Sequence, residues 1–522
     1  MFRSKCWLFF LPFLPHLALA SGEVVVAVGS YQAYALQKAI EAYPRCSSMF
    51  TLVTERDSRG ELLKGAKRAR IVVVDIMLSS LGKPLLEMAR KGELKGKRVY
   101  CVSSSTDDTP YHRAGFFFDK EVRTYYANPV EENMISLVGY ILAREFKVPA
   151  PFSPPILLPS MGIYHPRAPK FFTRSEDYLA WHKTLGVGVE YWVGMLFFPS
   201  YLTTGNKGVL DEIIRRFEAH GLGVIPAFGK YPADKAAVLF FDGRGKPLVD
   251  LVVTFCSKMS ASLKQETWRI LERLNVPVIN LIELFSSDVK AWRESPLGLA
   301  PVEVPWQVAM PEFSGVIEPT VVSGQKPGDP YRRFVAIPGE LDFLIARVRA
   351  WLRLRHKPNG EKRIAIIYYN HHPGKQNVGA SYLNVFASTV EILKALKEAG
   401  YRVEGKVTKG EIRRLILLSG RNVGSWAPGE LERMVKEGGV VKVPLSLYLR
   451  WYRRLPLAFR KGVEKDWGKP QNASIMTWNG SIILPAIRLG NVILMPQPSR
   501  GWGSDAWKLY HSATLYPHHQ YV

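Results

Sequence analysis

The chain has 522 residues, of which 47% are hydrophobic, 12% aromatic and 22% charged. This composition is too apolar and too aromatic for a disordered chain, and the 42 glycines and 36 prolines do not recur with the period of collagen. Lysine and arginine (70) exceed aspartate and glutamate (46) by 24. At roughly 150 residues per domain, the length predicts three or four domains, each large enough for its own core.

The first twenty residues have the composition of a secretory signal peptide. Arg3 and Lys5 precede an apolar stretch over residues 6–19, and residues 18–20 (ALA) form a small-x-small cleavage pattern. We therefore expect export to the periplasm or cell surface and a mature charge of 24 − 2 = +22. An uncleaved membrane tether is the alternative, and a cytoplasmic location follows if this interpretation is wrong. No later apolar run reaches the ~18 residues of a membrane-spanning helix, so we expect no span in the mature chain.

Three cysteines remain after the signal segment: Cys46, Cys101 and Cys256. Their number is odd and none belongs to a CxxC pair, which argues against a zinc-thiolate site. A Cys46–Cys101 disulfide is possible in an oxidising compartment, and three buried free thiols are the alternative.

Strands and helices alternate over residues 21–148, which predicts a small doubly wound α/β domain. The run Glu23–Gly29 is continuously apolar, as a parallel strand buried on both faces requires. Further strands are expected at Thr51–Thr54, Ile71–Ile76 and Arg98–Ser103, and helices at Gln32–Tyr43, Leu85–Lys91 and Glu131–Phe146.

A proline-rich connector follows at residues 149–170, where the density of proline excludes helices and central strands. Residues 171–345 then predict a second α/β domain. Its expected strands are Tyr191–Phe198, Gly223–Phe228, Asp250–Phe255 and Val276–Leu281, and its helices are Val209–His220 and Ser262–Leu274. Residues 296–345 are again rich in proline and glycine.

A third region, residues 346–522, opens with a basic amphipathic helix at Arg347–Lys357. A strand at Ile364–Tyr369 and a helix at Val385–Gly400 come next, and residues 401–522 are expected to mix short strands with loops. The predicted fold class is thus multidomain α/β, with Rossmann- or flavodoxin-like units of parallel sheet flanked by helices.

The loop between that strand and helix is the best local signal of a ligand site. It reads His371-His372-Pro-Gly-Lys375-Gln-Asn377-Val-Gly-Ala-Ser381 and lies at the carboxyl edge of a sheet, beside a helix N-terminus that can bind anions. It is neither a Walker A loop nor a GxGxxG loop. A plain connecting loop is the alternative, and the glycine-rich segment Gly420–Glu430 is interpreted as a helix entry.

The C-terminal stretch brings His511, His518 and His519 close together in sequence, and imidazole is a common metal ligand. No acidic residue or cysteine follows Asp505, and adjacent histidines on an extended chain point to opposite faces. A solvent-facing histidine tail is the alternative. The basic runs are scattered and match no nucleic-acid motif, so we expect no nucleic-acid partner; a polycarboxylate small molecule suits the charge.

These segments, in this order, resemble the large subunit of cobaltochelatase, CobN, and its relative, the magnesium chelatase H subunit. The resemblance covers roughly residues 160–522. It is carried by Gly162–Pro166, Tyr178–Trp181, Val193–Phe197, Pro277–Ile279, Pro311–Gly315, Ile317–Pro319, Tyr369–Val385, Gly420–Val423, Trp467-Gly468, Gly490–Val492 and Pro496–Gly501. It is strongest in Tyr369–Val385.

The resemblance implies a tetrapyrrole-binding subunit that inserts Co²⁺ or Mg²⁺, with ATP hydrolysed by separate AAA+ subunits. It implies tetrapyrrole contacts from Lys375, Asn377, Ser381 and Arg500, and metal contacts from His511, His518 and His519. Lys375 and Arg500 would pair with ring carboxylates. His371 and His372 are weaker candidates, and no catalytic residue is assigned.

Three departures from the family pattern qualify this expectation. The chain stops upstream of the family's His-Gly-x-Leu-Glu type motif, so we expect a fragment lacking the best acid/base groups. Ser504 stands where many relatives carry an acidic residue. The export signal would separate the chain from cytoplasmic ATP and AAA+ partners. An exported, non-catalytic protein that binds haem or a corrinoid is therefore the alternative function.

Overall fold

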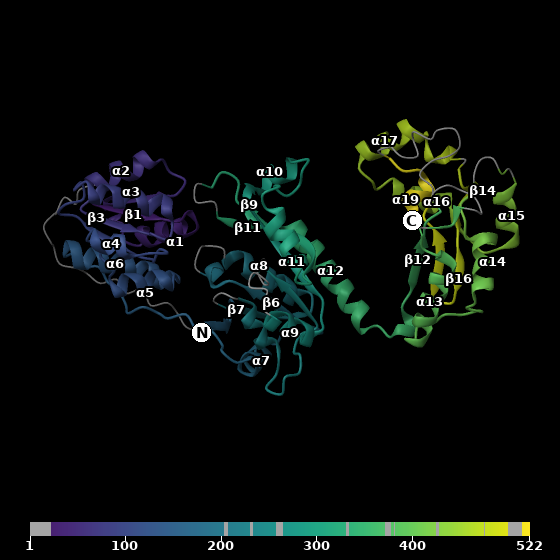
Figure 1. Cartoon of the computed structure of the whole chain (residues 1–522), viewed down its shortest axis with the longest axis horizontal. Helices are drawn as coiled ribbons and strands as arrows, with labels where there is room; N and C mark the ends of the chain where they lie inside the picture. Colours follow the sequence, from purple (N-terminus) through teal and green to yellow (C-terminus); the bar gives the residue numbers. More distant parts are fainter. Residues whose placement is uncertain are drawn as a thin grey trace. The chain divides into compact units, whose positions relative to one another are not determined.

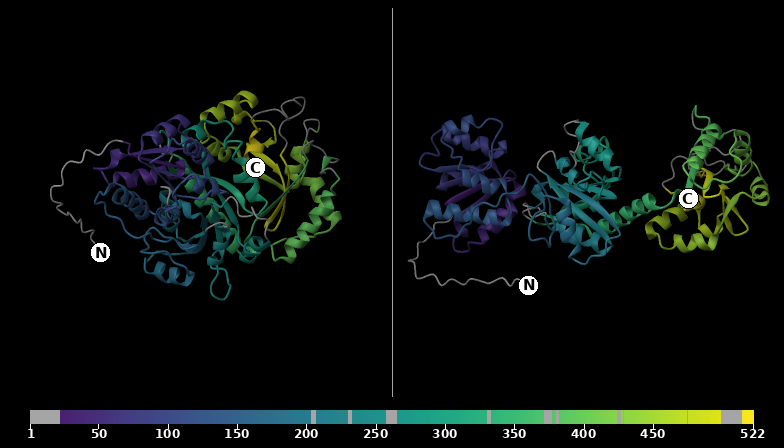
Figure 2. Two further views of the ribbon diagram at one scale, coloured as in Figure 1. Left: turned by 60° about the vertical axis from the view of Figure 1, so that its left-hand side comes forward. Right: turned by 90° about the horizontal axis from the view of Figure 1, so that it is seen from below.

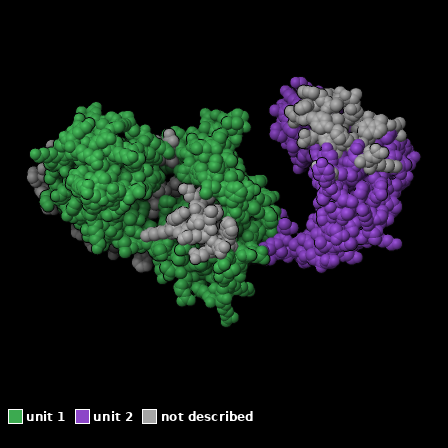
Figure 3. All heavy atoms as spheres, viewed as in Figure 1, with its two compact units in different colours: residues 1–352 green, residues 353–522 purple. Residues whose placement is uncertain are grey.

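The computed structural model describes residues 22–202, 207–229, 233–256, 265–329, 333–370, 377–379, 382–423, 427, 429–473, 475–498 and 514–522. The chain divides into two compact units, Met1–Leu352 and Arg353–Val522 (Figure 3). Both units contain parallel strands flanked by helices, which confirms the predicted multidomain α/β class (Figure 1). The predicted signal segment, residues 1–20, lies outside the described residues.

The first unit begins with a four-stranded parallel sheet of order β2-β1-β3-β4. The strands are β1 (Val24–Val28), β2 (Phe50–Thr54), β3 (Ile71–Val74) and β4 (Arg98–Cys101). Six helices accompany them: α1 (Ser30–Glu41), α2 (Arg59–Arg68), α3 (Ser79–Arg90), α4 (Thr109–Arg113), α5 (Lys120–Ala127) and α6 (Glu131–Phe146). All four predicted strands and α1, α3 and α6 are present.

Alternate residues of β1 explain why this sheet is covered on both faces. Val24, Val26 and Val28 belong to the core cluster with α1, α5 and α6. Val25 and Ala27 belong to the cluster with α2 and α3. Helix α2 was not predicted from the sequence. A capping box of Ser58 and Glu61 begins this helix, and only Leu62 and Ala66 are buried.

A seven-stranded sheet of order β11-β10-β9-β8-β6-β7-β5 follows in the same unit. Its strands are β5 (Met161–Ile163), β6 (Tyr191–Phe197), β7 (Leu222–Gly229), β8 (Leu251–Thr254), β9 (Val278–Asp288), β10 (Ile317–Gln325) and β11 (Phe334–Ala336). The two edge strands, β5 and β11, are antiparallel and the others are parallel. The proline-rich connector thus contributes an edge strand, where proline is tolerated.

Helices cover both faces of this sheet (Figure 2). The core cluster on one face contains α8 (Lys207–Ala219) and α12 (Pro338–His356), and that on the other contains α7 (Ser175–Lys183) and α9 (Gln265–Leu274). The short helices α10 (Val289–Glu294) and α11 (Met310–Glu312) lie near β9 and β10 in the chain. Residues 296–345, for which the sequence predicted no element, contain β10, β11 and the start of α12. Register shifts along β10 obscure the alternation of a regular strand.

The second unit contains two three-stranded sheets. One has the order β12-β17-β16, from Ile364–Tyr368, Val492–Pro496 and Ile487–Leu489, and β12 is parallel to β17. The other has the order β13-β15-β14, from Val440–Pro444, Ser481–Pro485 and Thr477–Trp478. The helices are α13 (Val385–Glu398), α14 (Lys409–Ser419), α15 (Glu430–Glu437), α16 (Leu445–Tyr452), α17 (Leu457–Trp467) and α19 (Pro517–Tyr521).

The prediction for residues 401–522 was incomplete, because α14, α16, α17 and α19 lie there besides α15, whose start was predicted. Helices α16 and α17 are short, and few of their residues are buried: Tyr448 and Tyr452 in α16, Val463 in α17. These three side chains join Ile482 and Leu484 of β15 in one core cluster. Packing against the small sheet, rather than a strong helical pattern, therefore holds these segments.

The three cysteines of the described chain are buried and none forms a disulfide, in agreement with the second of the two alternatives. Desolvation by burial raises the pKa of the Cys101 thiol to about 12, so this thiol stays protonated. Among the described helices, none combines the length and apolar character needed to cross a bilayer.

Candidate functional site

The strongest convergence of polar groups in the second unit lies where β12 and β17 end. These parallel neighbours end at Tyr368 and Pro496, so the segments that follow them leave the sheet at the same edge. Asn370 follows β12 and is fully buried, and Asn422 follows α14 and is 1% exposed. Ligands of open α/β sheets bind at this edge.

Hydrogen bonds of Asn422 join three segments that are distant in the sequence. Its backbone N–H donates to Asn370 Oδ1 (2.7 Å), and its side-chain amide donates to the carbonyls of Asn370 (2.7 Å) and Gln497 (2.8 Å). The Gln497 N–H donates to the Tyr368 carbonyl at 2.8 Å. We call Asn370, Asn422 and Gln497 the amide network. It fixes the starting points of the loops that leave the sheet edge.

Close packing beside the amide network explains the glycine at position 420. The Tyr368 hydroxyl donates to the Gly420 carbonyl, and a Cβ at Gly420 would collide with that hydroxyl oxygen. Burial raises the pKa of Tyr368, so its hydroxyl remains a donor. Arg421 is 4% exposed and forms an ion pair with Glu430 at the start of α15. A helix therefore begins at Glu430, as predicted, and residues 420–422 are joined to the sheet edge.

The structure describes only some of the site residues expected from the sequence. Asn377 is exposed, and the neighbouring Gly379 N–H donates to the Tyr369 carbonyl at 3.2 Å. Four further expected site residues, Lys375, Ser381, Arg500 and His511, lie outside the described residues, and so do the weaker candidates His371 and His372. Lys375 lies five residues after Asn370, and Arg500 lies three residues after Gln497.

Comparison with known proteins shows the family. The sequence profile described as CobN/Magnesium Chelatase matches residues 123–522. This chain belongs to the CobN/magnesium chelatase family. The match begins within α5, earlier than the start near residue 160 expected from the motifs, so it includes part of the first sheet's domain.

Individual relatives match most of this chain but a small part of their own length. The chloroplastic magnesium-chelatase subunit ChlH of Oryza sativa subsp. indica is 29% identical over 387 residues, which are 71% of this chain and 27% of that protein. The aerobic cobaltochelatase subunit CobN of Pseudomonas aeruginosa is 27% identical over 379 residues, which are 70% of this chain and 29% of that protein. The chain thus spans less than a third of the length of these two relatives.

A solved structure shares the fold. The catalytic subunit of cobaltochelatase from Mycobacterium tuberculosis aligns with a TM-score of 0.63 at 20% sequence identity. The alignment covers 95% of this chain and 40% of that one. The common architecture therefore extends over both units, including the part of the first unit that precedes the family match.

Two of the expected metal ligands of this family member, His518 and His519, lie on a short helix, α19. His518 is 1% exposed, with its ring centroid 5.5 Å from that of Tyr516, and His519 is half-buried. The Tyr448 hydroxyl donates to the Gln520 side chain at 2.9 Å, which joins α19 to α16. The described end of the chain is thus packed on the unit and is not an extended, solvent-facing tail.

A largely buried cluster in the first unit was not predicted from the sequence. His165 and His182 each contact the same Glu218 oxygen, at 3.1 and 2.7 Å from their Nε2 atoms, and Arg167 donates to the other oxygen at 2.6 Å. We call these four residues the histidine–glutamate cluster. Burial favours the neutral carboxyl, but hydrogen bonds from both histidines lower the pKa of Glu218 to about 2.

The histidine–glutamate cluster has the ligand types of a metal site, because two imidazoles and a carboxylate lie within 4.8 Å of one another. The tautomer of His165 opposes metal binding. The Arg167 backbone N–H donates to His165 Nδ1 at 3.2 Å, so the ring proton lies on Nε2 and is donated to Glu218. A His-Pro pair at residues 165–166 was the available sequence signal, and nothing linked it to Glu218.

Proposed function

We propose that this chain is the tetrapyrrole-binding part of a CobN-type chelatase large subunit. The reaction is insertion of Co²⁺, Mg²⁺ or another divalent metal into a porphyrin or corrin ring, or its removal. One observation carries the proposal. The segments after β12, after α14 and after β17, each of which carries a motif of the family resemblance, meet in the amide network at one sheet edge.

The chemistry divides the proposed site into positioning and contacting groups. Metal insertion requires loss of the pyrrole protons and of water from the metal ion, and a neutral amide is a poor acceptor for those protons. Asn370 and Asn422 therefore position the loops. Lys375 and Arg500 would pair with ring carboxylates, and Asn377 and Ser381 would contact the ring's polar groups.

The divalent metal is a substrate of the proposed reaction, and His511, His518 and His519 are its proposed ligands. ATP would act only through AAA+ partner subunits. The proton acceptor is proposed to lie in the further length that the relatives possess, since this chain spans 27–29% of ChlH and CobN.

A second candidate function is an exported, non-catalytic carrier of haem or a corrinoid. The basic start, the apolar stretch and the small-x-small pattern of residues 1–20 favour it. Cell fractionation followed by N-terminal sequencing separates the two. A periplasmic protein that begins at residue 21 supports the carrier, and a cytoplasmic protein that keeps residues 1–20 rejects it.

The proposed function is tested by absorbance titration of the chain with metal-free and metallated porphyrins and corrinoids at low and high salt. We expect a saturable absorbance shift that persists at high salt. The affinity for the tetrapyrrole is expected to be about tenfold lower in Lys375→Ala/Arg500→Ala, because this variant loses charge-assisted hydrogen bonds. Lys406→Ala/Lys461→Ala, which removes two exposed charges from the same unit, is the control. Equal affinity in both double variants would contradict these contacts.

The metal ligands need separate variants, because His518 is buried and its removal can unfold α19. His519→Ala and His518→Gln are compared for Co²⁺-dependent tetrapyrrole binding, with circular dichroism as the control for folding. Co²⁺ incorporation with and without ATP and AAA+ subunits then distinguishes a chelatase part from a carrier. Unchanged metal dependence in both variants would remove these histidines from the site.

A further inference from the structure

A cavity lies in the first unit, at the carboxyl edge of the four-stranded sheet. The chain leaves β1 toward β2 on one side and reaches β3 and β4 on the other, so the strand order reverses between β1 and β3. Open α/β sheets bind ligands at such a switch point. The cavity measures about 760 Å³, within the 300–1,000 Å³ usual for small-molecule sites.

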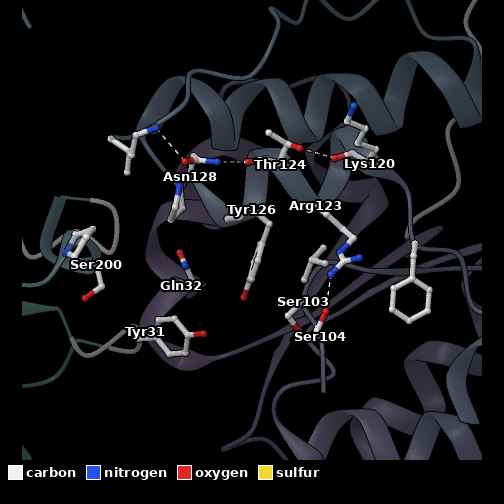
Figure 4. Close-up of a pocket in the computed structure, with 16 residues that line it drawn as sticks. Tyr31, Gln32, Ser103, Ser104, Lys120, Arg123, Thr124, Tyr126, Asn128 and Ser200 are labelled. Carbon is white, nitrogen blue, oxygen red and sulfur yellow. Dashed lines mark hydrogen bonds between the residues drawn. The ribbon is translucent and has the colours of Figure 1, made fainter. Parts of the chain in front are cut away.

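The cavity is walled by the segments that follow β1 and β4 and by α5 (Figure 4). Tyr31, Phe118 and Tyr126 contribute aromatic rings to its lining, and Val102 and Leu158 contribute aliphatic groups. Tyr31 is 43% exposed, so its ring is available to a ligand. Aromatic walls of this kind favour a flat ring system.

The charge of the lining is positive. Lys120 and Arg123 of α5 both line the cavity, and no acidic residue is among its described lining residues. Arg123 donates to the Ser104 hydroxyl at 2.5 Å, which holds the guanidinium at the wall. Asp107 and Asp108 precede this helix in the chain without lining the cavity, and the charge of Asp108 interacts with Arg123.

The nearest buried carboxylate, Asp75 after β3, is already satisfied. It accepts hydrogen bonds from the hydroxyls of Tyr126 (2.9 Å), Tyr31 (3.2 Å) and Ser103 (2.5 Å) and from the Met77 N–H (3.1 Å). We call these groups the hydroxyl network. These four donors stabilise the carboxylate without removing its charge, and burial together with that charge raises the pKa of Tyr31 and Tyr126. Lys120 and Arg123, the two cations among the described lining residues, outnumber this one carboxylate.

Gln32 provides an independent indication of a ligand. It lines the cavity, is 5% exposed, and its Oε1 atom has no hydrogen-bond partner in the described structure. Figure 4 shows its amide group at the edge of the space between Tyr31 and Tyr126. A buried acceptor without a donor destabilises the fold, and a ligand N–H or O–H would supply the missing donor.

We propose that this cavity binds a planar aromatic small molecule with an anionic substituent. The ring lies against the aromatic wall, the carboxylate or phosphate pairs with Lys120 and Arg123, and a ring N–H or O–H donates to Gln32. This site is separate from the amide network of the second unit, so it goes beyond the proposed function.

The test uses the whole chain and two anionic probes, each with a matched neutral form. Flavin mononucleotide is compared with riboflavin, and deuteroporphyrin IX with its dimethyl ester, by fluorescence titration. We expect one anionic probe to bind at micromolar concentration and its neutral form about tenfold more weakly. Flavin binding identifies a phosphate ligand, and porphyrin binding identifies a carboxylate ligand.

Variants assign the binding to this cavity. Lys120→Ala/Arg123→Ala is expected to lower the affinity for the anionic probe about tenfold and to leave the affinity for its neutral form unchanged. Gln32→Leu is expected to lower the affinity for both forms. Lys91→Ala/Lys95→Ala, which removes two exposed lysines from the same domain, is the control. If Arg123→Ala unfolds the domain, Lys120→Glu alone replaces it.

Two results would overturn this assignment. One is failure of both anionic probes to saturate below about 1 mM, the affinity limit of weak specific binding. The other is binding that the cavity variants do not change. Porphyrin binding that depends on Lys375 and Arg500 but not on Lys120 and Arg123 would support the proposed function while rejecting this cavity, so the two failures are distinguishable.

Discussion

Polar groups at two sheet edges of this protein are satisfied by different kinds of hydrogen-bond partner. At the edge of β1, β3 and β4, the hydroxyl network surrounds a buried carboxylate, Asp75, beside an open cavity. At the edge of β12 and β17, the amide network of Asn370, Asn422 and Gln497 is neutral, and its two asparagines are buried. Both edges must satisfy polar groups that the end of a strand leaves unpaired.

The difference lies in which groups can reorient. A hydroxyl rotates about its C–O bond and can donate or accept, whereas a backbone carbonyl only accepts and its direction is fixed by the chain. The hydroxyl network can therefore adjust to a changed charge or a bound ligand. The amide network specifies one arrangement of three segments, as the positioning of loops requires.

The largest effect is expected for Asn422→Asp in the amide network. The substitution replaces the donor to the carbonyls of Asn370 and Gln497 by an acceptor in a buried place, so we expect a loss of about 3–5 kcal/mol in the stability of the second unit. Hydrogen exchange along β12 and β17 measures it. Asn472→Asp, at an exposed position of the same unit, is the control. Equal protection in the two variants would show that the network does not hold the segments together.

A buried glutamate in the seven-stranded sheet, Glu283, can be compared with Asp75, because hydroxyl groups also donate to its carboxylate. Glu283 accepts hydrogen bonds from Tyr201 (2.5 Å) and Ser323 (2.9 Å). Desolvation nevertheless raises its pKa from 4.5 to about 7. The folded state therefore keeps a proton that the unfolded chain releases between pH 4.5 and 7, so the stability due to this proton is lost as pH rises through that interval.

This loss amounts to about 3 kcal/mol, since the change in pKa is about two and a half units. Urea unfolding of the first unit between pH 4.5 and 8, followed by tryptophan fluorescence, measures it. Glu283→Gln is expected to remove the decline, and Glu294→Gln, at an exposed position on α10, is expected to keep it. A decline of the same size in both variants would mean that the two hydroxyls suffice to hold Glu283 ionised.

A smaller effect is expected for Asp75→Asn in the hydroxyl network. The new amide keeps one acceptor oxygen, and the hydroxyls of Tyr31, Tyr126 and Ser103 can turn to accept from its N–H groups, so we expect a loss of about 1–2 kcal/mol. Chemical unfolding of the first unit provides the measurement. A loss as large as that of Asn422→Asp would refute the distinction between reorienting and fixed partners.

The smallest effect is expected when zinc is added. In the histidine–glutamate cluster, the Arg167 N–H holds the His165 ring in the tautomer that donates to Glu218. We therefore expect no Zn²⁺ binding there at about 100 μM Zn²⁺, which is 100 times a dissociation constant of about 1 μM. Thermal unfolding with and without ZnCl₂ is compared for the natural chain and His182→Ala. A zinc-dependent rise in the unfolding temperature that is lost in His182→Ala would show a metal site. A ligand at 100 times its dissociation constant stabilises the folded state by about 2.7 kcal/mol.

The sequence by itself determined the alternation of buried strands and helices over the first two sheets, because a run such as Val24–Val28 encodes its burial in consecutive side chains. It also determined the family, since its motifs are local strings of residues. It did not predict α2 or α16, where few side chains are buried and neighbouring elements supply the stability. It did not predict β10 either, where register shifts interrupt the alternation of a regular strand.

Only the tertiary structure decided which polar residues meet. Asn422 contacts Asn370 across 52 positions and Gln497 across 75, and Glu218 contacts His165 across 53. Gln32 and Arg123 line one cavity because the strand order reverses between β1 and β3. Local patterns record burial and backbone preference, whereas a hydrogen bond between distant segments depends on the order in which the strands assemble.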